Sequence, residues 1–257
     1  MAKSNLGYVL GTVIALAVAS PANAAVELIT NGNFETTSAA QSTQMNGTNN
    51  TNGNVTGWYT SGYNFIFLAN SAAASGTQAD TTGATNGLKL WGPGTGNANG
   101  LTTSPDGKNF VGADNNYQTG PISQSVTGLT AGAGYYLSFY WAAAQQSGYD
   151  GATQERWAVT FGSQSQSTVQ YSLASHAFSG WMAVTMYFTA SAATQTLSFL
   201  ANGTPGGAPP FSLLDGVSLV AAPEPTTWAL MLTGVVGLVA ATRFARRNSK
   251  SAGSAQA

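Results

Sequence analysis

The residues that could do acid–base or nucleophilic chemistry are few in this sequence. His176 is the only histidine and cysteine is absent, which excludes multi-histidine metal centres, thiol catalysis and Cys-ligated zinc. A serine triad would need His176 beside an acid and an exposed serine, and the sequence contains no Gly-x-Ser-x-Gly turn. We therefore predict that His176 is a structural or loop histidine.

Two pairs of carboxylates have spacings that could bring them together. Asp150 and Glu155 are separated by a predicted turn, and Asp106 and Asp114 flank a short predicted strand. Glycoside hydrolysis needs two carboxylates on either side of the bond that breaks. No motif selects either pair, and Glu155 beside Arg156 equally suits a solvated ion pair. The sequence therefore favours a protein that is not an enzyme.

Charge is distributed unevenly along the chain. Residues 25–222 hold three basic and eight acidic side chains, a formal charge of −5, whereas the whole chain has −1 because most basic residues lie near its two ends. Nucleic acids require a basic surface. This composition therefore predicts no nucleic-acid partner for residues 25–222.

The elements that must position these residues are predicted to be strands. Aromatic and β-branched runs, each bounded by turn residues, occur at 87–91, 109–113, 121–127, 135–141, 156–161, 181–188, 196–201 and 211–220. No stretch has convincing helical periodicity. Short strands at this spacing predict an all-β, jelly-roll-like antiparallel β-sandwich. We expect a hairpin-like connection at 128–132 and a long surface loop at 36–57, which is uncharged and low in complexity.

Aromatic residues suggest a second kind of chemistry, the stacking of sugar rings. Those in or beside predicted loops are the candidates for an exposed binding surface: Trp58, Tyr63, Tyr117 and Tyr149. Core packing is the alternative for each of them. Three further tryptophans alternate with apolar neighbours and are predicted to be core: Trp141, Trp157 and Trp181.

The two ends of the predicted domain carry short motifs. "ELITNGNFET" (27–36) and "LLDGVSLV" (213–220) resemble the first and last strands of galactose-binding-like jelly rolls, a fold common among carbohydrate-binding modules. The resemblance implies that Glu35 and Asp215 hold a structural calcium ion, a role that suits hard oxygen ligands. The alternative is that both are ordinary polar groups at a loop or a strand end.

The N-terminal residues 1–24 have the pattern of a secretory signal peptide. Lys3 precedes the apolar run 8–19, and small residues in an A-x-A pattern end at Ala24. This pattern predicts export through the Sec translocon and cleavage after Ala24.

The C-terminal segment has three parts in order. Pro223-Glu224-Pro225 is followed by the uncharged, apolar stretch 226–242, which is long enough for a minimal transmembrane helix, and then by a basic cluster. The cluster contains Arg243, Arg246 and Arg247. Positive charge after the helix predicts a cytoplasmic C-terminus. An ordinary membrane anchor with incidental prolines is the alternative to a more specific signal.

This arrangement resembles the PEP-CTERM sorting signal of Gram-negative bacteria. The resemblance assigns 223–250 to the signal and 251–257 to a tail, and it implies processing by an exosortase in the inner membrane. It further implies release to the cell surface or a matrix rich in exopolysaccharide. The expected function is thus an exported, non-catalytic or structural domain that contacts glycans; a secreted hydrolase acting on exopolysaccharide is the alternative.

Overall fold

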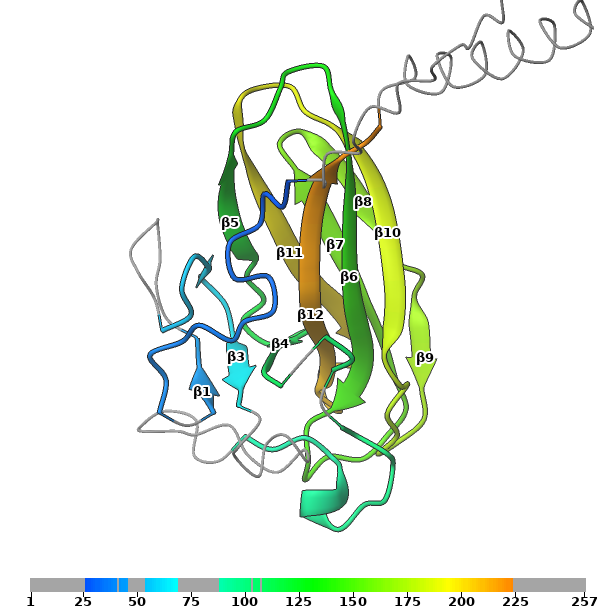
Figure 1. The fold of residues 1–257 in the computed structure, drawn as a ribbon. Coiled ribbons are helices and arrows are strands. Elements are labelled where there is room, and N and C mark those ends of the chain that lie inside the picture. Colours follow the sequence, from blue (N-terminus) through cyan, green and yellow to red (C-terminus); the bar gives the residue numbers. More distant parts are fainter. Residues whose placement is uncertain are drawn as a thin grey trace, which may run out of the picture. The chain divides into compact units, whose positions relative to one another are not determined.

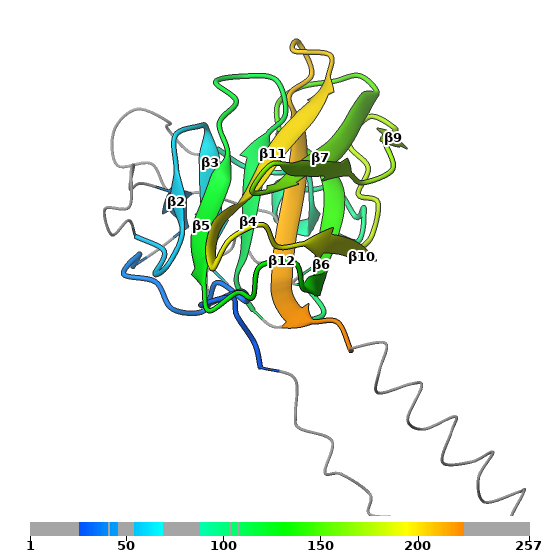
Figure 2. The same cartoon turned by 90° about the horizontal axis from the view of Figure 1, so that it is seen from above.

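The structure is a computed structural model that describes residues 26–40, 42–45, 54–68, 88–102, 104–106 and 108–223. In this part of the chain the fold is all-β, and the one helical turn is the 3-10 helix η2 (Pro93–Thr95). Two antiparallel sheets form two layers, as Figures 1 and 2 show. The prediction of an antiparallel β-sandwich is confirmed.

Twelve strands make up the two sheets of the described residues. They are β1 (Thr43–Gln44), β2 (Tyr59–Thr60), β3 (Asn64–Phe67), β4 (Phe110–Asp114), β5 (Ile122–Thr127), β6 (Gly134–Gln145), β7 (Thr153–Phe161), β8 (Gln164–Ser167), β9 (Tyr171–Leu173), β10 (Met182–Thr189), β11 (Thr194–Thr204) and β12 (Pro210–Ala221). The first sheet has the order β1-β3-β4-β12-β6-β10. The second has the order β2-β5-β11-β7-β8, with β9 also paired to β7.

The main core lies between the sheets and follows from alternation along the strands. In β6, Tyr135, Leu137, Phe139 and Trp141 face inward, as the period-two pattern predicts. Trp157 on β7 is fully buried opposite them. Aromatic side chains dominate this layer, and each buries a large apolar area, so a domain without disulfides has a sufficient core.

A second, smaller core lies on the other face of the first sheet. Along β4, Val111 joins the main core whereas Phe110 joins the second one. Leu88, Leu90 and Leu101 pack there too, so the segment 88–102 covers this part of the sheet. Burial on both faces explains why β3 and β4 are buried at every position.

Several local predictions were wrong. Residues 128–132 do not form a hairpin, because β5 belongs to the second sheet and β6 to the first. In the segment predicted at 87–91, the described residues make only an isolated bridge between Leu90 and Gln146. The predicted loop 36–57 contains β1, which is followed by the buried Met45.

The beginning and the end of the sandwich lie side by side. The amide of Leu28 donates to the carbonyl of Leu219 at 3.1 Å, and the amide of Val217 donates to the carbonyl of Gly32 at 2.9 Å. Residues 25–222 form one compact unit. The strand pairings and both cores described here lie inside that unit, so we expect it to fold by itself.

The predicted terminal signals fall almost wholly outside the described residues. This applies to the signal peptide 1–24, to the apolar stretch 226–242 and to every sorting-motif residue after Pro223. Among the residues that are described, none forms a helix long and apolar enough to cross a membrane.

Candidate functional site

Four aromatic residues, two exposed and two partly buried, lie on the loops that join the strands at the far end of the sandwich. At this end β4, β6 and β11 finish, while β3, β7 and β12 begin. Figure 1 shows η2 and the loop after β6 there, away from the end at which the described chain enters and leaves the sandwich. Tyr63, Trp91, Tyr117 and Tyr149 come from four separate loops, and we call them the loop-end surface.

Hydrogen bonds and a ring contact hold Trp91, and its carbonyl accepts the Asn99 side chain at 2.9 Å. Its amide donates to the carbonyl of Gln145 at 2.9 Å, and its indole Nε1 donates to the carbonyl of Tyr149 at 2.9 Å. Its ring packs on the imidazole of His176, with centroids 4.1 Å apart and an interplanar angle of 35°. The side chain is only partly buried. Trp91 thus offers a ring that is fixed before any ligand arrives.

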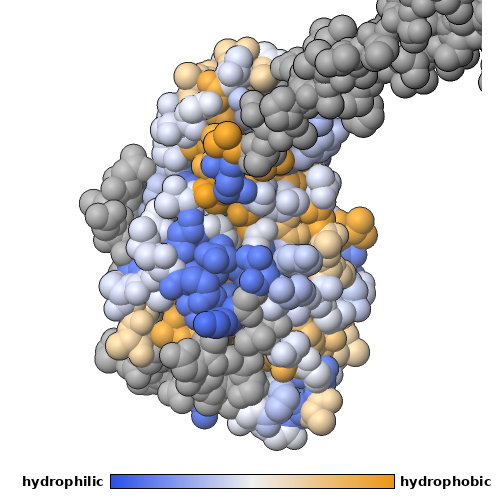
Figure 3. Space-filling view, in the orientation of Figure 1, coloured by the Kyte–Doolittle hydropathy of each residue, from blue (hydrophilic) through white to orange (hydrophobic). Residues whose placement is uncertain are grey.

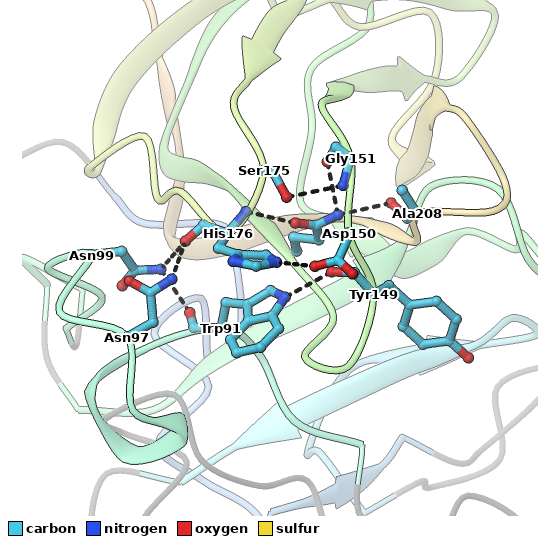
Figure 4. Close-up of polar contacts among 10 residues, drawn as sticks. Trp91, Asn97, Asn99, Tyr149, Asp150, Gly151, Ser175, His176 and Ala208 are labelled. Atoms are coloured by element: carbon cyan, nitrogen blue, oxygen red, sulfur yellow. Dashed lines mark hydrogen bonds and ion pairs between the residues drawn. The ribbon is translucent and has the colours of Figure 1, made fainter.

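His176 is a loop residue, as predicted, and several groups clamp it (Figure 4). Its φ of +62° is in the left-handed region, which costs a non-glycine residue about 1–3 kcal/mol. Three side chains hold its backbone: Gln145 accepts its amide, and Asn97 and Asn99 donate to its carbonyl. Its Nε2 lies 2.6 Å from Oδ1 of Asp150. The strained backbone holds the imidazole against Trp91.

Tyr63 and Tyr117 meet edge to face, with ring centroids 5.3 Å apart at an interplanar angle of 89°. Burial raises the pKa of the Tyr63 phenol, and the nearby Asp114, Tyr117 and Tyr149 raise it further. Tyr149 therefore lies within electrostatic reach of Tyr63. Tyr117 is 56 % exposed and Tyr149 is 42 % exposed, so both rings have free faces.

Asp114 shapes the loop that carries Tyr117. Its Oδ1 accepts the backbone amides of Asn116 and Tyr117, both at 2.8 Å, in the manner of an Asx-turn. Burial raises the pKa of Asp114, and these two hydrogen bonds oppose the rise. The carboxyl group therefore has a structural role in the surface.

Residues that adjoin these loops in the sequence form an open hollow of about 490 Å³. It lies at the start of β7 and at the ends of β9 and β11. The lining residues are both polar and apolar: Ala152, Thr153, Gln154, Ser172, Leu173, Ala174, Thr204 and Pro205. Its size is in the range of small-ligand sites. Hydroxyl and amide groups of this kind can form hydrogen bonds with a polyhydroxy ligand.

The prediction that Trp58 belongs to an exposed surface is wrong. The side chain is only 1 % exposed, and its Nε1 donates to the carbonyl of Asn31 at 2.9 Å. Its ring packs between Phe34 and Phe199 in the main core. Of the predicted core tryptophans, Trp141 and Trp157 are buried, whereas Trp181 is only partly buried against the second core.

Trp91 is the residue that sequence reasoning missed. The pattern of residues 87–91 predicts a strand that ends at Trp91, although Trp91 directly precedes Gly92-Pro93-Gly94. A tryptophan beside a glycine–proline turn sits where backbone reverses at the surface. That signal could have placed it with the loop tyrosines.

The two residues expected to hold calcium, Glu35 and Asp215, lie within each other's electrostatic influence. Burial raises the pKa of Asp215 to about 7; the Ser104 hydroxyl and the Gly216 amide oppose the rise, and Asp106 and Glu35 add to it. Asp215 has no exposed surface. Its Oδ2 accepts the Ser104 hydroxyl, while its Oδ1 has no hydrogen-bond partner among the described residues.

Glu35 is fixed by the loop that follows Asp106. Its Oε1 accepts the amides of Lys108 at 3.0 Å and Asn109 at 2.7 Å. Neighbouring carboxylates with one unpartnered buried oxygen suit a hard dication. Within the described ranges no group of three or more His, Cys, Asp or Glu side chains has metal-binding geometry. A calcium ion here would therefore need backbone carbonyls as additional ligands.

No family model matches the chain, and the search of curated proteins gave no match. Solved structures with a similar arrangement include a family 4 carbohydrate-binding module, CBM4, with 18% identity over 76% of this chain and 99% of that one, at a TM-score of 0.36. A CBM6 domain of a laminarinase from Zobellia galactanivorans has 14% identity over 45% of this chain and 82% of that one, at 0.30. An arabinose-bound GH51 α-L-arabinofuranosidase has 13% identity over 77% and 27%, at 0.38. At TM-scores below 0.5, these likenesses assign no activity to this chain.

Proposed function

We propose that the domain is a non-catalytic module that contacts neutral glycans through the loop-end surface. The observation that carries the proposal is Trp91, a partly exposed indole that is fixed on two edges before binding. The exposed rings of Tyr117 and Tyr149 extend it. Aromatic rings stack on the apolar faces of sugars, and a preorganised ring loses little conformational entropy on binding.

The charge of the surroundings favours a neutral ligand. Residues 25–222 have a formal charge of −5, and Asp150 is exposed beside the aromatic rings. Acidic polymers would be repelled here. Stacking and hydroxyl hydrogen bonds remain the main attractive contributions, and the hollow beside β7 and β9 supplies hydroxyl and amide partners.

The test is affinity electrophoresis of the unit 25–222 in gels that contain β-glucan, xylan, galactomannan or dextran. We expect retardation by at least one polymer, and the retardation should persist in high salt because charge contributes little. Trp91→Ala and Tyr117→Ala should each weaken binding about five- to tenfold, since one stacked ring contributes on the order of 1 kcal/mol. Val169→Ser, which removes an exposed side chain outside the surface, is the control.

Two outcomes would contradict this function. If no polymer changes the mobility of the domain, the domain does not contact these glycans. Release of new reducing ends from a retarded polymer would establish hydrolysis instead, the alternative expected from the sequence.

We also propose the cellular route that the terminal motifs imply. The chain is exported by the Sec translocon and held by the helix 226–242. An exosortase then reads Pro223-Glu224-Pro225, and the domain reaches a polysaccharide matrix at the cell surface. The support is the order of the three C-terminal parts.

Calcium is part of the proposal as a structural ion. Glu35 and Asp215 would supply carboxylate oxygens, and the support is the unpartnered buried Oδ1 of Asp215. An ion there would tie the N-terminal segment to β12 and stabilise the fold without touching the loop-end surface.

A further inference from the structure

A second group of exposed aromatic residues lies on the outer face of the first sheet. The outward side chains of β6, β10 and β12 form rows across the strands: Tyr136 is opposite Tyr187 and Val220, and Ser138 is opposite Thr185 and Ser218. In the next row, Tyr140 is opposite Ala183 and Asp215, and Asp215 is fully buried. We call the eight residues other than Asp215 the sheet-face platform. None of these eight carries a charge.

Tyr136 and Tyr187 are the aromatic part of the platform. They are 43 % and 51 % exposed, and their rings contact each other with centroids 5.5 Å apart at 63°. A Cβ atom on Gly134 would lie 2.1 Å from the Tyr187 hydroxyl oxygen. The Tyr187 ring therefore lies over a position that has to lack a side chain for the ring to keep this place.

The outer edge of β10 is tied down beside the same ring. The side chain of Gln166 donates to the carbonyl of Tyr187, and Gln164 exchanges two hydrogen bonds with the backbone of Thr189. The backbone groups of Tyr187 and Thr189 that these glutamines occupy are the ones to which an added strand would have to bond. The edge is thus blocked here against strand addition by another protein chain, while the face of the platform stays open.

The platform matches an uncharged, polyhydroxy partner. The ionisable groups at its margins are Glu27, which accepts the Ser218 hydroxyl, Asp106, which lies close to Gly216 and Tyr140, and the buried Asp215 opposite Tyr140. All three are acidic, so the face disfavours acidic polymers. Figure 3 shows this face: strongly hydrophilic residues gather beside β12, whereas the surface over β6 and β10 is pale to orange. Tyrosine rings flanked by serine and threonine hydroxyls suit stacked sugars.

The platform is remote from the loop-end surface. Tyr136 is near the start of β6, and the loop-end surface follows its last residue, Gln145. Nine residues of strand span roughly 30 Å. A short sugar segment stacked on one aromatic group does not reach the other, so each surface can hold a chain of its own.

We propose that the domain bridges two neutral polysaccharide chains, one at the loop-end surface and the other at the sheet-face platform. This inference rests on the proposed function for the first of these contacts. Two weak sites on one rigid body hold a network together by avidity, although each contact alone exchanges rapidly.

The experiment measures single contact and bridging separately. The unit 25–222 is first assayed for retardation in a polysaccharide gel. It is then added to beads that carry the retarding polysaccharide, and capture of the same polymer in soluble, fluorescent form is measured. We expect capture by the wild type, and at least a fivefold loss for Gly134→Ala and for Tyr136→Ser combined with Tyr187→Ser.

Gly134→Ala is the sharper variant because it removes no aromatic residue and only displaces the Tyr187 ring. Both sets of variants should keep most of their retardation, since the loop-end surface is intact, and Val169→Ser should behave as wild type. Cooperative thermal unfolding identifies the variants that are folded.

Retardation without capture by the wild type would overturn bridging and leave the proposed function intact. Full capture by folded platform variants would also overturn it. A wild-type dimer that the platform variants dissociate would make the platform an interface between copies. Retardation that only the platform variants abolish would instead refute the loop-end site and keep the platform as the glycan contact.

Discussion

Nε2 of His176 lies 2.6 Å from Oδ1 of Asp150, and the same imidazole packs on the indole of Trp91. The two paired side chains are 31 % and 86 % exposed, so their attraction contributes at most about 1 kcal/mol to stability. The pair therefore matters for orientation: it fixes the ring on which Trp91 rests.

His176→Asn tests this orientation. Asparagine tolerates the left-handed backbone at this position, so the loop should keep its course while the imidazole is lost. We expect glycan affinity to fall about fivefold, because Trp91 loses a ring contact worth on the order of 1 kcal/mol. Titration with a retarding polysaccharide, followed by tryptophan fluorescence, measures the change. Equal affinity in variant and wild type would make the imidazole irrelevant to the site.

Trp58→Ala should act on stability and not on binding. Removal of a buried tryptophan creates a cavity and costs about 3–5 kcal/mol, and it removes one of the two donors to the carbonyl of Asn31. Trp58→Phe keeps a ring in the core and should cost less. Urea unfolding measures both variants. If Trp58→Ala changed unfolding only slightly but greatly reduced retardation by the glycan, Trp58 would belong to the binding surface and not to the core.

Glu155 should make the domain less stable as the pH rises. Its side chain is fully buried, and Oε2 has no hydrogen-bond partner among the described residues. Burial raises its pKa from 4.5 to about 8, against the opposing hydrogen bond from Thr153. Between these pH values the folded state holds a proton that the unfolded state has released, so unfolding becomes easier with rising pH.

This pKa shift lowers the free energy of unfolding by on the order of 5 kcal/mol as the pH rises from 4.5 to 8. Glu155→Gln keeps an acceptor for Thr153 and cannot ionise, so its unfolding free energy should fall less than that of the wild type over this window. Chemical denaturation at pH 5, 7 and 9 measures the difference between the two proteins. Parallel pH curves would show that Glu155 is ionised in the folded state.

Calcium should raise the melting temperature of the unit 25–222, and a chelator should lower it, because the ion binds the folded state alone. Asp215→Asn should abolish the response, since it removes the charge of the carboxylate with the unpartnered oxygen. Magnesium is the control for ionic strength and for cation size. If millimolar calcium does not shift the melting temperature, Glu35 and Asp215 do not form a calcium site.

Replacement of Pro223, Glu224 and Pro225 by alanine should block processing in the exporting bacterium. The uncleaved protein should stay in the membrane fraction and run at higher mass on an immunoblot. Alanine replacement of Thr226 and Thr227, beside the motif, is the control. Identical fractionation of the motif variant and the wild type would mean that no enzyme reads the motif.

Alternation in the sequence predicted the strands that have one face in the core. In β6, Tyr135 and Trp141 occupy the same face as predicted, because side chains alternate in every strand. β8, with the sequence Gln-Ser-Gln-Ser, carries no such signal. It is a strand because β7 supplies a pairing edge, and that depends on tertiary context.

The loop-end surface was predictable only in part. Tyr117 and Tyr149 follow turn signals, and the structure leaves both exposed. Trp58 lies beside a polar loop too, but packing against Phe34 takes it into the core. The role of Trp91 depends on contacts with Gln145 and His176, which are distant in sequence, and local patterns contain no information on such contacts.

The antiparallel contact of residues 28–32 with β12 also determines how the domain would carry mechanical load. A pull on Val26 and Ala222 acts at one end of the sandwich, where the chain enters and leaves side by side. The bonds that tie Glu27 and Leu28 to Ser218 and Leu219 would break first, and that between Gly32 and Val217 would follow. Sequential breakage of this kind yields at low force. Tension along the chain would therefore peel off the N-terminal segment before it reached the loops that carry Trp91 and Tyr117.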